Sequence, residues 1–233
     1  MRLADLRGSG GRRQDRADLL LLVVVFAANP TQVFVVPQAW QFLTQPLFAA
    51  LALALVLRSG ATLRDVGLER RALGAGLRWG LIAAGVILAA LAVTWAVPDG
   101  RELLDDPAVV TSSTADLLHE TLLRIPVVTA GPEEVLFRGA VLAAAVRRWG
   151  ALPGALASSL LFGLWHLSPT LNDGSFASVW AGVGAAVGAV AFTFAAGLVF
   201  VWLRRRSGSL LAPFLAHWAA NALGLAAVHL ASH

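Results

Sequence analysis

The sequence predicts an all-α protein of the polytopic membrane class, a bundle of about seven transmembrane helices. Apolar runs of about 20 residues recur along the 233-residue chain, each long enough to cross a hydrocarbon core of about 30 Å as a helix. Charged residues make up only 14% of the chain, against about 25% in soluble domains, and the mean hydropathy is +0.72. The runs show no strict apolar–polar alternation, so helices are favoured over a β-barrel.

The chain divides into three stretches. Residues 1–16 are polar and rich in Arg and Gly, which predicts a disordered basic cytoplasmic tail. Residues 17–113 hold transmembrane helices without a recognised motif, and residues 114–233 form the core that carries the candidate site. The helices are expected, in chain order, at 18–36 (kinked near Pro30), 38–57, 74–97, 117–146, 152–167, 177–203 and 208–231.

The distribution of arginine predicts the topology. All 18 basic residues are arginine, and 15 of them lie in four clusters, in the tail and at 58–78, 147–148 and 204–206. With seven helices these clusters share one side of the membrane, and the acidic segment with Asp99 and Glu102 lies on the other. The positive-inside rule then places the N-terminus in the cytoplasm, and we expect an integral protein of a bacterial plasma membrane.

The composition indicates whether nucleic acid or the lipid bilayer is an expected partner. The pI of 11.3 is typical of nucleic-acid-binding proteins, but the arginines form no single face or tail, so no nucleic acid is expected. The lipid bilayer is the expected surrounding. Cysteine is absent, which excludes thiolate chemistry and disulfides.

Three of the expected helices carry polar residues that are costly in a bilayer and are therefore candidates for function. Glu134 and Arg138 are four residues apart on one helix face and can pair, whereas Glu133 points about 100° away. His217 and Asn221 are again four residues apart and can face one cavity. The remaining candidates are His166 and, one turn before it, Phe162 as a wall.

The depths of these residues agree. Counted at 1.5 Å per residue from the cytoplasmic ends of their helices, Glu133, His166, His217 and Asn221 lie about 21, 24, 17 and 23 Å from the cytoplasmic edge. Groups from the fourth, fifth and seventh expected helices therefore converge at one level. This predicts a site in the core between those three helices.

Each of these residues also has a purely structural interpretation. The Glu134–Arg138 pair can simply stabilise a bundle, and a single histidine can hydrogen-bond a neighbouring helix. Glu133 has no base four residues later, so its partner must come from another helix, and the histidines at its depth are the candidates. Taken jointly, the residues favour a catalytic or metal site, whose groove Trp165 and Trp218 are placed to shape.

At these three motifs the sequence resembles the CPBP family of CAAX proteases, bacteriocin-processing enzymes and abortive-infection proteins, which are type II CAAX prenyl endopeptidase-like. The family pattern is Glu-Glu-x-x-x-Arg, Phe-x-x-x-His and His-x-x-x-Asn or Asp, which here is Glu133-Glu134…Arg138, Phe162…His166 and His217…Asn221. The likeness covers about 117–233 and leaves the first half of the chain unmatched.

The resemblance implies an intramembrane endopeptidase. Its substrates would be membrane-associated peptides or lipidated proteins, either prenylated CAAX-type or bacteriocin-like. Glu133 and His166 would activate water, and His217 and Asn221 would stabilise the oxyanion. Glu134 and Arg138 would hold the site in shape.

The residues themselves also support peptide hydrolysis, and they are compatible with either a glutamate or a zinc mechanism. Amide hydrolysis needs a general base for water and donors for the oxyanion, with no cofactor. Glu133, His166 and His217 could instead bind zinc as in a metalloendopeptidase, but no His-Glu-x-x-His motif is present, so the glutamate mechanism is favoured.

Two other functions compete with the enzyme. A non-catalytic immunity or scaffold protein could bind a peptide in the same cavity. A small transporter could use Glu and His as a proton relay, although no pair of broken helices marks inverted repeats. The sequence leaves the oligomeric state and the substrate undetermined.

Overall fold

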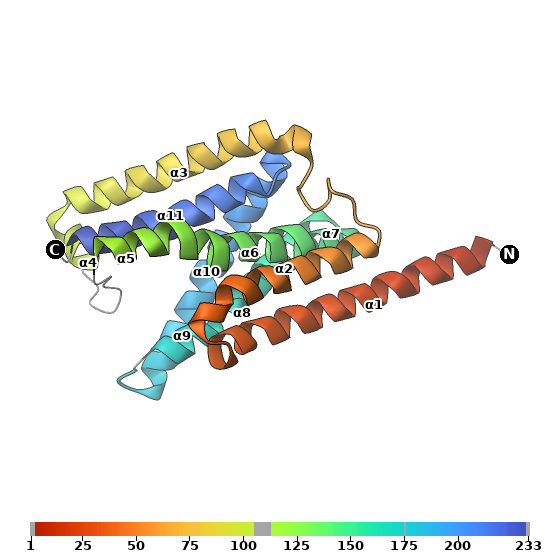
Figure 1. Ribbon diagram of the computed structural model, residues 1–233, viewed down its shortest axis with the longest axis horizontal. Helices are drawn as coiled ribbons and strands as arrows, with labels where there is room; N and C mark the ends of the chain where they lie inside the picture. Colours follow the sequence, from red (N-terminus) through yellow and green to blue (C-terminus); the bar gives the residue numbers. More distant parts are fainter. Residues whose placement is uncertain (1–2, 105–112, 175, 232–233) are drawn as a thin grey trace.

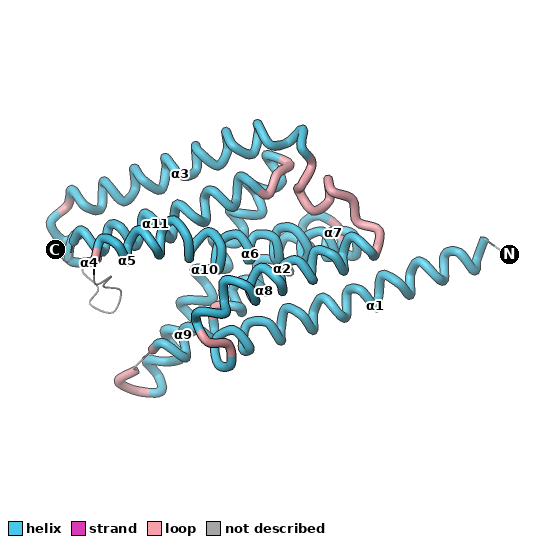
Figure 2. The backbone as a smooth tube through the Cα atoms, in the orientation of Figure 1, coloured by secondary structure: helices cyan, strands magenta, loops and turns pink. Residues whose placement is uncertain are grey.

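The computed structural model describes residues 3–104, 113–174 and 176–231, and these residues form helices and loops without a strand (Figures 1 and 2). The N-terminal helices are α1 (Leu3–Pro30), α2 (Gln41–Arg58), α3 (Leu73–Ala96) and α4 (Pro98–Leu104). A continuous helical stretch follows, made of α5 (Thr114–His119), π-helical Glu120–Ala130, α6 (Gly131–Glu134), π-helical Val135–Val141 and α7 (Leu142–Trp149). The last helices are α8 (Ala151–Trp165), α9 (Leu167–Asp173), α10 (Val179–Ser207) and α11 (Leu211–Ala231).

The predicted all-α membrane bundle is confirmed. Six helices of the described chain are long and apolar enough to cross a membrane, at Gln14–Val35, Gln38–Arg58, Arg70–Ala96, Ala151–Asn172, Val179–Ser207 and Leu211–Ala231. The expected span at 117–146 is helical throughout but is not one of these six, and it carries the charges of the candidate site. Large apolar side chains are exposed on the outer helix faces, such as Leu81 and Val86 of α3, as lipid contact requires.

The N-terminal segment differs from its prediction. The sequence predicted a disordered tail over residues 1–16, whereas the backbone is helical from Leu3 onward and continuous with the first span. Extending an existing helix costs far less than nucleating one, so a polar stretch can continue the helix of the apolar run that follows it. The N-terminal part of α1 projects beyond the bundle (Figure 1).

Hydrogen bonds gather the arginine clusters at one end of the bundle. Arg147, at the end of α7, donates to the hydroxyl and carbonyl of Ser59 at 3.0 Å. Arg204, near the end of α10, donates to two carbonyls of the same loop after α2, and Arg148 pairs with Asp15 of α1. One side of the bundle is therefore strongly basic, as the arginine pattern predicted.

The loop after α2 is itself well ordered by local bonds. The backbone N–H of Thr62 donates to the carboxylate of Asp65, and this bond lowers the pKa of that carboxyl. At Gly67 the backbone is left-handed, with a φ of +78°, and a Cβ there would collide with the guanidinium of Arg204. The loop is thus closely fitted to α10.

The acidic segment lies at the other end. Asp99 and Glu102 belong to α4, which packs against α3 and against α11 near the C-terminus (Figure 1). Asp105 and Asp106 lie outside the described residues. The separation of basic and acidic ends agrees with the predicted topology, and the cytoplasmic location of the N-terminus stays a prediction.

The helical stretch from Thr114 to Trp149 lies at the centre of the bundle. It contacts α2 and α11, and through its C-terminal half α8, while α3 packs on α11 and α10 on α8 (Figure 2). The most completely buried large side chain of this stretch is the cation Arg138, with Phe137 beside it. The core of the fold therefore contains the buried guanidinium of Arg138.

Candidate active site

A buried ion pair forms the centre of the site. Nη1 of Arg138 donates to Oε1 of Glu134 at 3.0 Å, and the two side chains are 0% and 1% exposed. Their spacing of four residues on one helix brings them together without help from the rest of the fold. Nδ1 of His217, from α11, lies 2.9 Å from the same oxygen. Glu134 therefore links the central stretch to α11.

Aromatic rings enclose the cation and the histidine. The guanidinium of Arg138 lies 3.9 Å from the ring centre of Phe162 and 4.9 Å from that of Phe200. Within the described chain its Nε and Nη2 have no hydrogen-bond acceptor, so the ring faces stand in for one. Phe200 also stacks on His217, with ring centres 5.1 Å apart. These rings hold the Arg138 guanidinium and the His217 ring in place and exclude water from them.

Glu133 is oriented differently from its neighbour. Its Oε1 accepts a hydrogen bond from Nε1 of Trp165 at 3.1 Å, and its Oε2 lies 3.9 Å from Nε2 of His217. Oε2 is buried and makes no hydrogen bond within the described chain. A carboxylate held through one oxygen and open at the other is suited to bind and deprotonate a water molecule.

Glu133 lines a cavity of about 520 Å³. His166 lines the same cavity, and its Nδ1 lies 2.8 Å from the carbonyl oxygen of Phe162. A carbonyl can only accept, so Nδ1 carries the proton and Nε2 holds the lone pair in the neutral ring. The other lining residues are mostly polar and come from the end of α1, the segment between α1 and α2, α2 itself, the central stretch, the end of α8 and α9: Asn29, Gln32, Val33, Val36, Gln38, Gln41, Gln45, Arg124, Val128, Thr129, Trp165, Pro169 and Asn172.

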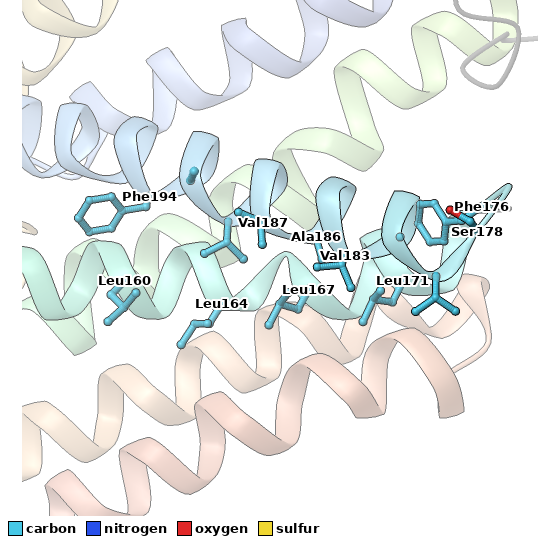
Figure 3. A pocket seen from close by; sticks show the side chains of 14 residues that line it. Leu160, Leu164, Leu167, Leu171, Phe176, Ser178, Val183, Ala186, Val187 and Phe194 are labelled. Atoms are coloured by element: carbon cyan, nitrogen blue, oxygen red, sulfur yellow. The ribbon is translucent and has the colours of Figure 1, made fainter.

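A larger cavity of about 880 Å³ lies on the other side of α8 and α9, against α10 (Figure 3). Apolar side chains such as Leu164, Leu167 and Val187 line it, and none of its described lining residues is an acid or a base. This cavity is therefore not the candidate active site, although it is larger than the cavity that Glu133 lines. Helix α8 separates this apolar cavity from the polar one.

The structure assembles most of the residues that the sequence singled out. Glu133, Glu134, Arg138, Phe162 and His217 contact one another as described above, and His166 shares the cavity with Glu133. Asn221 is different, because it is half-buried, does not line the cavity and makes no hydrogen bond within the described chain. Its assignment to the oxyanion stays a prediction.

Two residues of the site were missed from the sequence. Phe200 lies in an apolar helix where nothing distinguishes it from a lipid-facing phenylalanine. Gln32, which is only 2% exposed, lies in the first apolar span, and a polar residue there could have been noticed as a candidate. Trp165 was expected to shape the groove, and it also supplies the donor to Glu133.

The donor set does not fit a three-ligand metal site. Among the described residues no group of three His, Asp or Glu side chains is close enough to hold a metal ion together, and this includes Glu133, His166 and His217.

The bond from Trp165 to Glu133 gives a first testable expectation. Trp165→Phe keeps a ring against Phe137 but removes the donor, so Glu133 loses its fixed orientation. We expect kcat/KM for peptide cleavage to fall by about 10- to 100-fold, the worth of a hydrogen bond to a charged group. Trp218→Phe is the matched control, because Trp218 donates to the Thr121 carbonyl instead. Equal activities for both variants would contradict this role of Trp165.

The comparison with known families agrees with this geometry. Residues 117–223, a little under half of the chain, match the family described as type II CAAX prenyl endopeptidase Rce1-like. The matched range contains every candidate site residue, so the resemblance predicted from the three motifs is confirmed for this part of the chain. No curated protein and no solved structure gives a significant match.

Proposed function

We propose that this integral membrane protein, whose residues 117–223 match the type II CAAX prenyl endopeptidase Rce1-like family, is an intramembrane endopeptidase. The observation that carries the proposal is the environment of the Glu133 carboxylate. Its carboxylate is buried within a membrane bundle, is held at Oε1 by Trp165, and lines a polar cavity, with no hydrogen bond to Oε2 from any described residue. A membrane-embedded cavity that reaches a general base matches the needs of peptide-bond hydrolysis within the bilayer.

The proposed reaction uses Glu133 as the general base. Oε2 takes a proton from a bound water, which His166 helps to position, and the resulting hydroxide attacks the carbonyl carbon of the scissile bond. The tetrahedral oxyanion then collapses, the C–N bond breaks, and the proton held by Glu133 passes to the leaving amine. The products are a carboxylic acid and a free amine, and Glu133 is regenerated.

His217 is proposed to stabilise the oxyanion, with Asn221 as a second donor. The Nδ1 proton of His217 is directed to Glu134, so donation from Nε2 requires a doubly protonated ring. The Glu134–Arg138 ion pair thus orients His217 rather than touching the substrate.

The substrate class follows from the family alone. Family resemblance supports membrane-associated peptides, of the prenylated CAAX kind or bacteriocin-like. The proposed location is a bacterial plasma membrane with the arginine-rich end of the bundle in the cytoplasm, which the gathering of Arg147, Arg148 and Arg204 at one end supports.

The proposal is tested by cleavage of a quenched fluorescent peptide library, which includes farnesylated CAAX peptides, with purified protein in detergent. We expect cleavage that is lost in His166→Ala and that is unchanged by a zinc chelator, because the described donors do not form a metal group. Loss of cleavage on chelation, restored by added zinc, would instead make the protein a metalloendopeptidase. No cleavage of any library member would contradict the proposed activity.

A further inference from the structure

The cavity that Glu133 lines belongs to one end of the bundle. Much of its lining comes from the end of α1, the segment between α1 and α2, the first turns of α2, and α9. Helix α2 ends at Arg58 and α8 begins shortly after Arg148, so the first turns of α2 and the whole of α9 lie away from the arginine clusters. Figure 1 shows α9 and the turn between α1 and α2 at the end of the bundle opposite α7. The cavity therefore lies toward the end opposite the arginine clusters.

A polar path leads from this end to Glu133. Gln38 and Asn172 line the cavity and are exposed, whereas Glu133 is only 6% exposed. On the central stretch Thr129 and Arg124 also line the cavity, and they precede Glu133 by four and nine residues. The lining thus runs from exposed amides at the mouth, through partly buried polar groups, to the buried carboxylate.

Apolar packing closes the opposite direction. The residues that follow Glu133 toward Arg147 include Leu136, Phe137 and Val141, which are at most 5% exposed. They share one buried cluster with side chains from the last turns of α2, the loop after it, the last turns of α10 and the start of α11: Val56, Val66, Leu203 and Ala212. An apolar layer packed in this way excludes both water and a peptide chain. The described packing therefore leaves the mouth at Gln38 and Asn172 as the route to Glu133.

We infer that the substrate reaches Glu133 from the extracytoplasmic face of the membrane, an inference that rests on the proposed peptidase function. The positive-inside rule places the arginine clusters in the cytoplasm, and the cavity opens at the other end. The substrate class is then an exported polypeptide segment. A protein that is prenylated in the cytoplasm meets the arginine-rich face, where the apolar cluster separates it from Glu133.

The lining also indicates the conformation of that segment. The mouth and the path carry the primary amides of Gln38, Gln41, Gln45 and Asn172, which both donate and accept hydrogen bonds. An extended peptide has backbone N–H and C=O groups that need such partners, whereas a transmembrane helix has already paired its own. The cavity therefore fits an extended segment outside the bilayer better than a helix within it.

The sidedness is tested first by cysteine labelling, because the chain has no cysteine of its own and single-cysteine variants carry no background. Gln38→Cys places a thiol at the mouth, and Glu69→Cys places one in the loop at the arginine-rich end while every arginine stays. A membrane-impermeant maleimide added to intact spheroplasts should label Gln38→Cys, and it should label Glu69→Cys only after permeabilisation. The opposite pattern, or labelling of both variants in intact spheroplasts, would overturn the inference while the peptidase stands.

A sided cleavage assay then connects the mouth to the active site. A water-soluble, unlipidated peptide that the purified protein cleaves in a Glu133-dependent way is added to right-side-out and to inside-out vesicles. Right-side-out vesicles should cleave it, and inside-out vesicles should do so only after detergent opens them. A bulky maleimide on Gln38→Cys should block this cleavage, and the same label on Glu69→Cys should not.

The outcomes of this assay separate the inference from the function on which it rests. Cleavage by sealed inside-out vesicles, or undiminished cleavage by labelled Gln38→Cys, would overturn access through the extracytoplasmic mouth and leave the peptidase in place. Absence of any Glu133-dependent cleavage in detergent would overturn the peptidase itself, and this inference with it.

Discussion

Replacing Glu133 with glutamine is expected to lower peptide cleavage by about 10²- to 10⁴-fold, the usual contribution of a general base. The amide has the same shape, and its oxygen can still accept the hydrogen bond from Nε1 of Trp165, but it cannot take a proton from water. The variant should therefore fold and bind substrate with little change in KM while kcat collapses. The measurement is the initial rate of fluorescence release from a cleaved library peptide.

The control for this variant is Glu120→Gln. Glu120 lies on the same helical stretch but is 34% exposed and outside the cavity, so its neutralisation should leave kcat near the wild-type value. Thermal unfolding in the same detergent should show both variants close to the wild type. Glu133→Gln that cleaves as fast as Glu120→Gln would exclude Glu133 as the base. A biological effect that survives Glu133→Gln would favour the non-catalytic binding function.

Removing Arg138 is expected to have the largest effect on stability. Arg138→Met leaves Glu134 buried with no cation of its own helix to balance it, and breaking one side of a buried ion pair costs about 3 to 5 kcal/mol. Part of this loss comes from the rings of Phe162 and Phe200, which lose their contacts with the guanidinium. The free energy of unfolding in detergent, measured by denaturant titration, is expected to fall accordingly.

A double variant separates charge from packing. Combining Arg138→Met with Glu134→Gln removes the carboxylate that the loss of Arg138 leaves unpaired, so the double variant should be more stable than Arg138→Met alone. The double variant should lack activity, because His217 loses the carboxylate of Glu134 at Nδ1. Arg101→Met, at an exposed arginine, serves as the matched control and should unfold within about 0.5 kcal/mol of the wild type. A double variant less stable than the single one would show that the pair stabilises the fold by more than charge balance.

The Glu134–Arg138 ion pair shows which contacts the spacing of residues along one helix can predict. Glu134 and Arg138 were predicted to pair from their spacing, and they do so, because one helical turn fixes the distance between their side chains. The same reasoning placed Glu133 on another face and required a partner from another helix. Residue spacing could not predict that Trp165 donates a hydrogen bond to Glu133 or that His217 bonds to Glu134.

The N-terminal segment shows where local composition misled. Residues 1–16 are polar and Gly-rich, which predicted disorder, yet the helix is continuous from Leu3 through the apolar run. Helical backbone can extend from a stable span into a segment that would not form a helix alone. The composition of residues 1–16 describes that segment alone and does not include the effect of the apolar helix that follows it.

By itself the sequence determined the all-α membrane class, the helical segments and the three motifs that the family match later contained, because span length and i, i+4 spacing are local properties. Only the tertiary structure decided which side chains of different helices meet: Phe200 stacks on His217, Arg124 donates to Gln41, and Asn221 does not line the cavity. The reason is physical. Spans that are apolar on nearly every face carry little information about how each helix is rotated, and that rotation is set by close packing between helices.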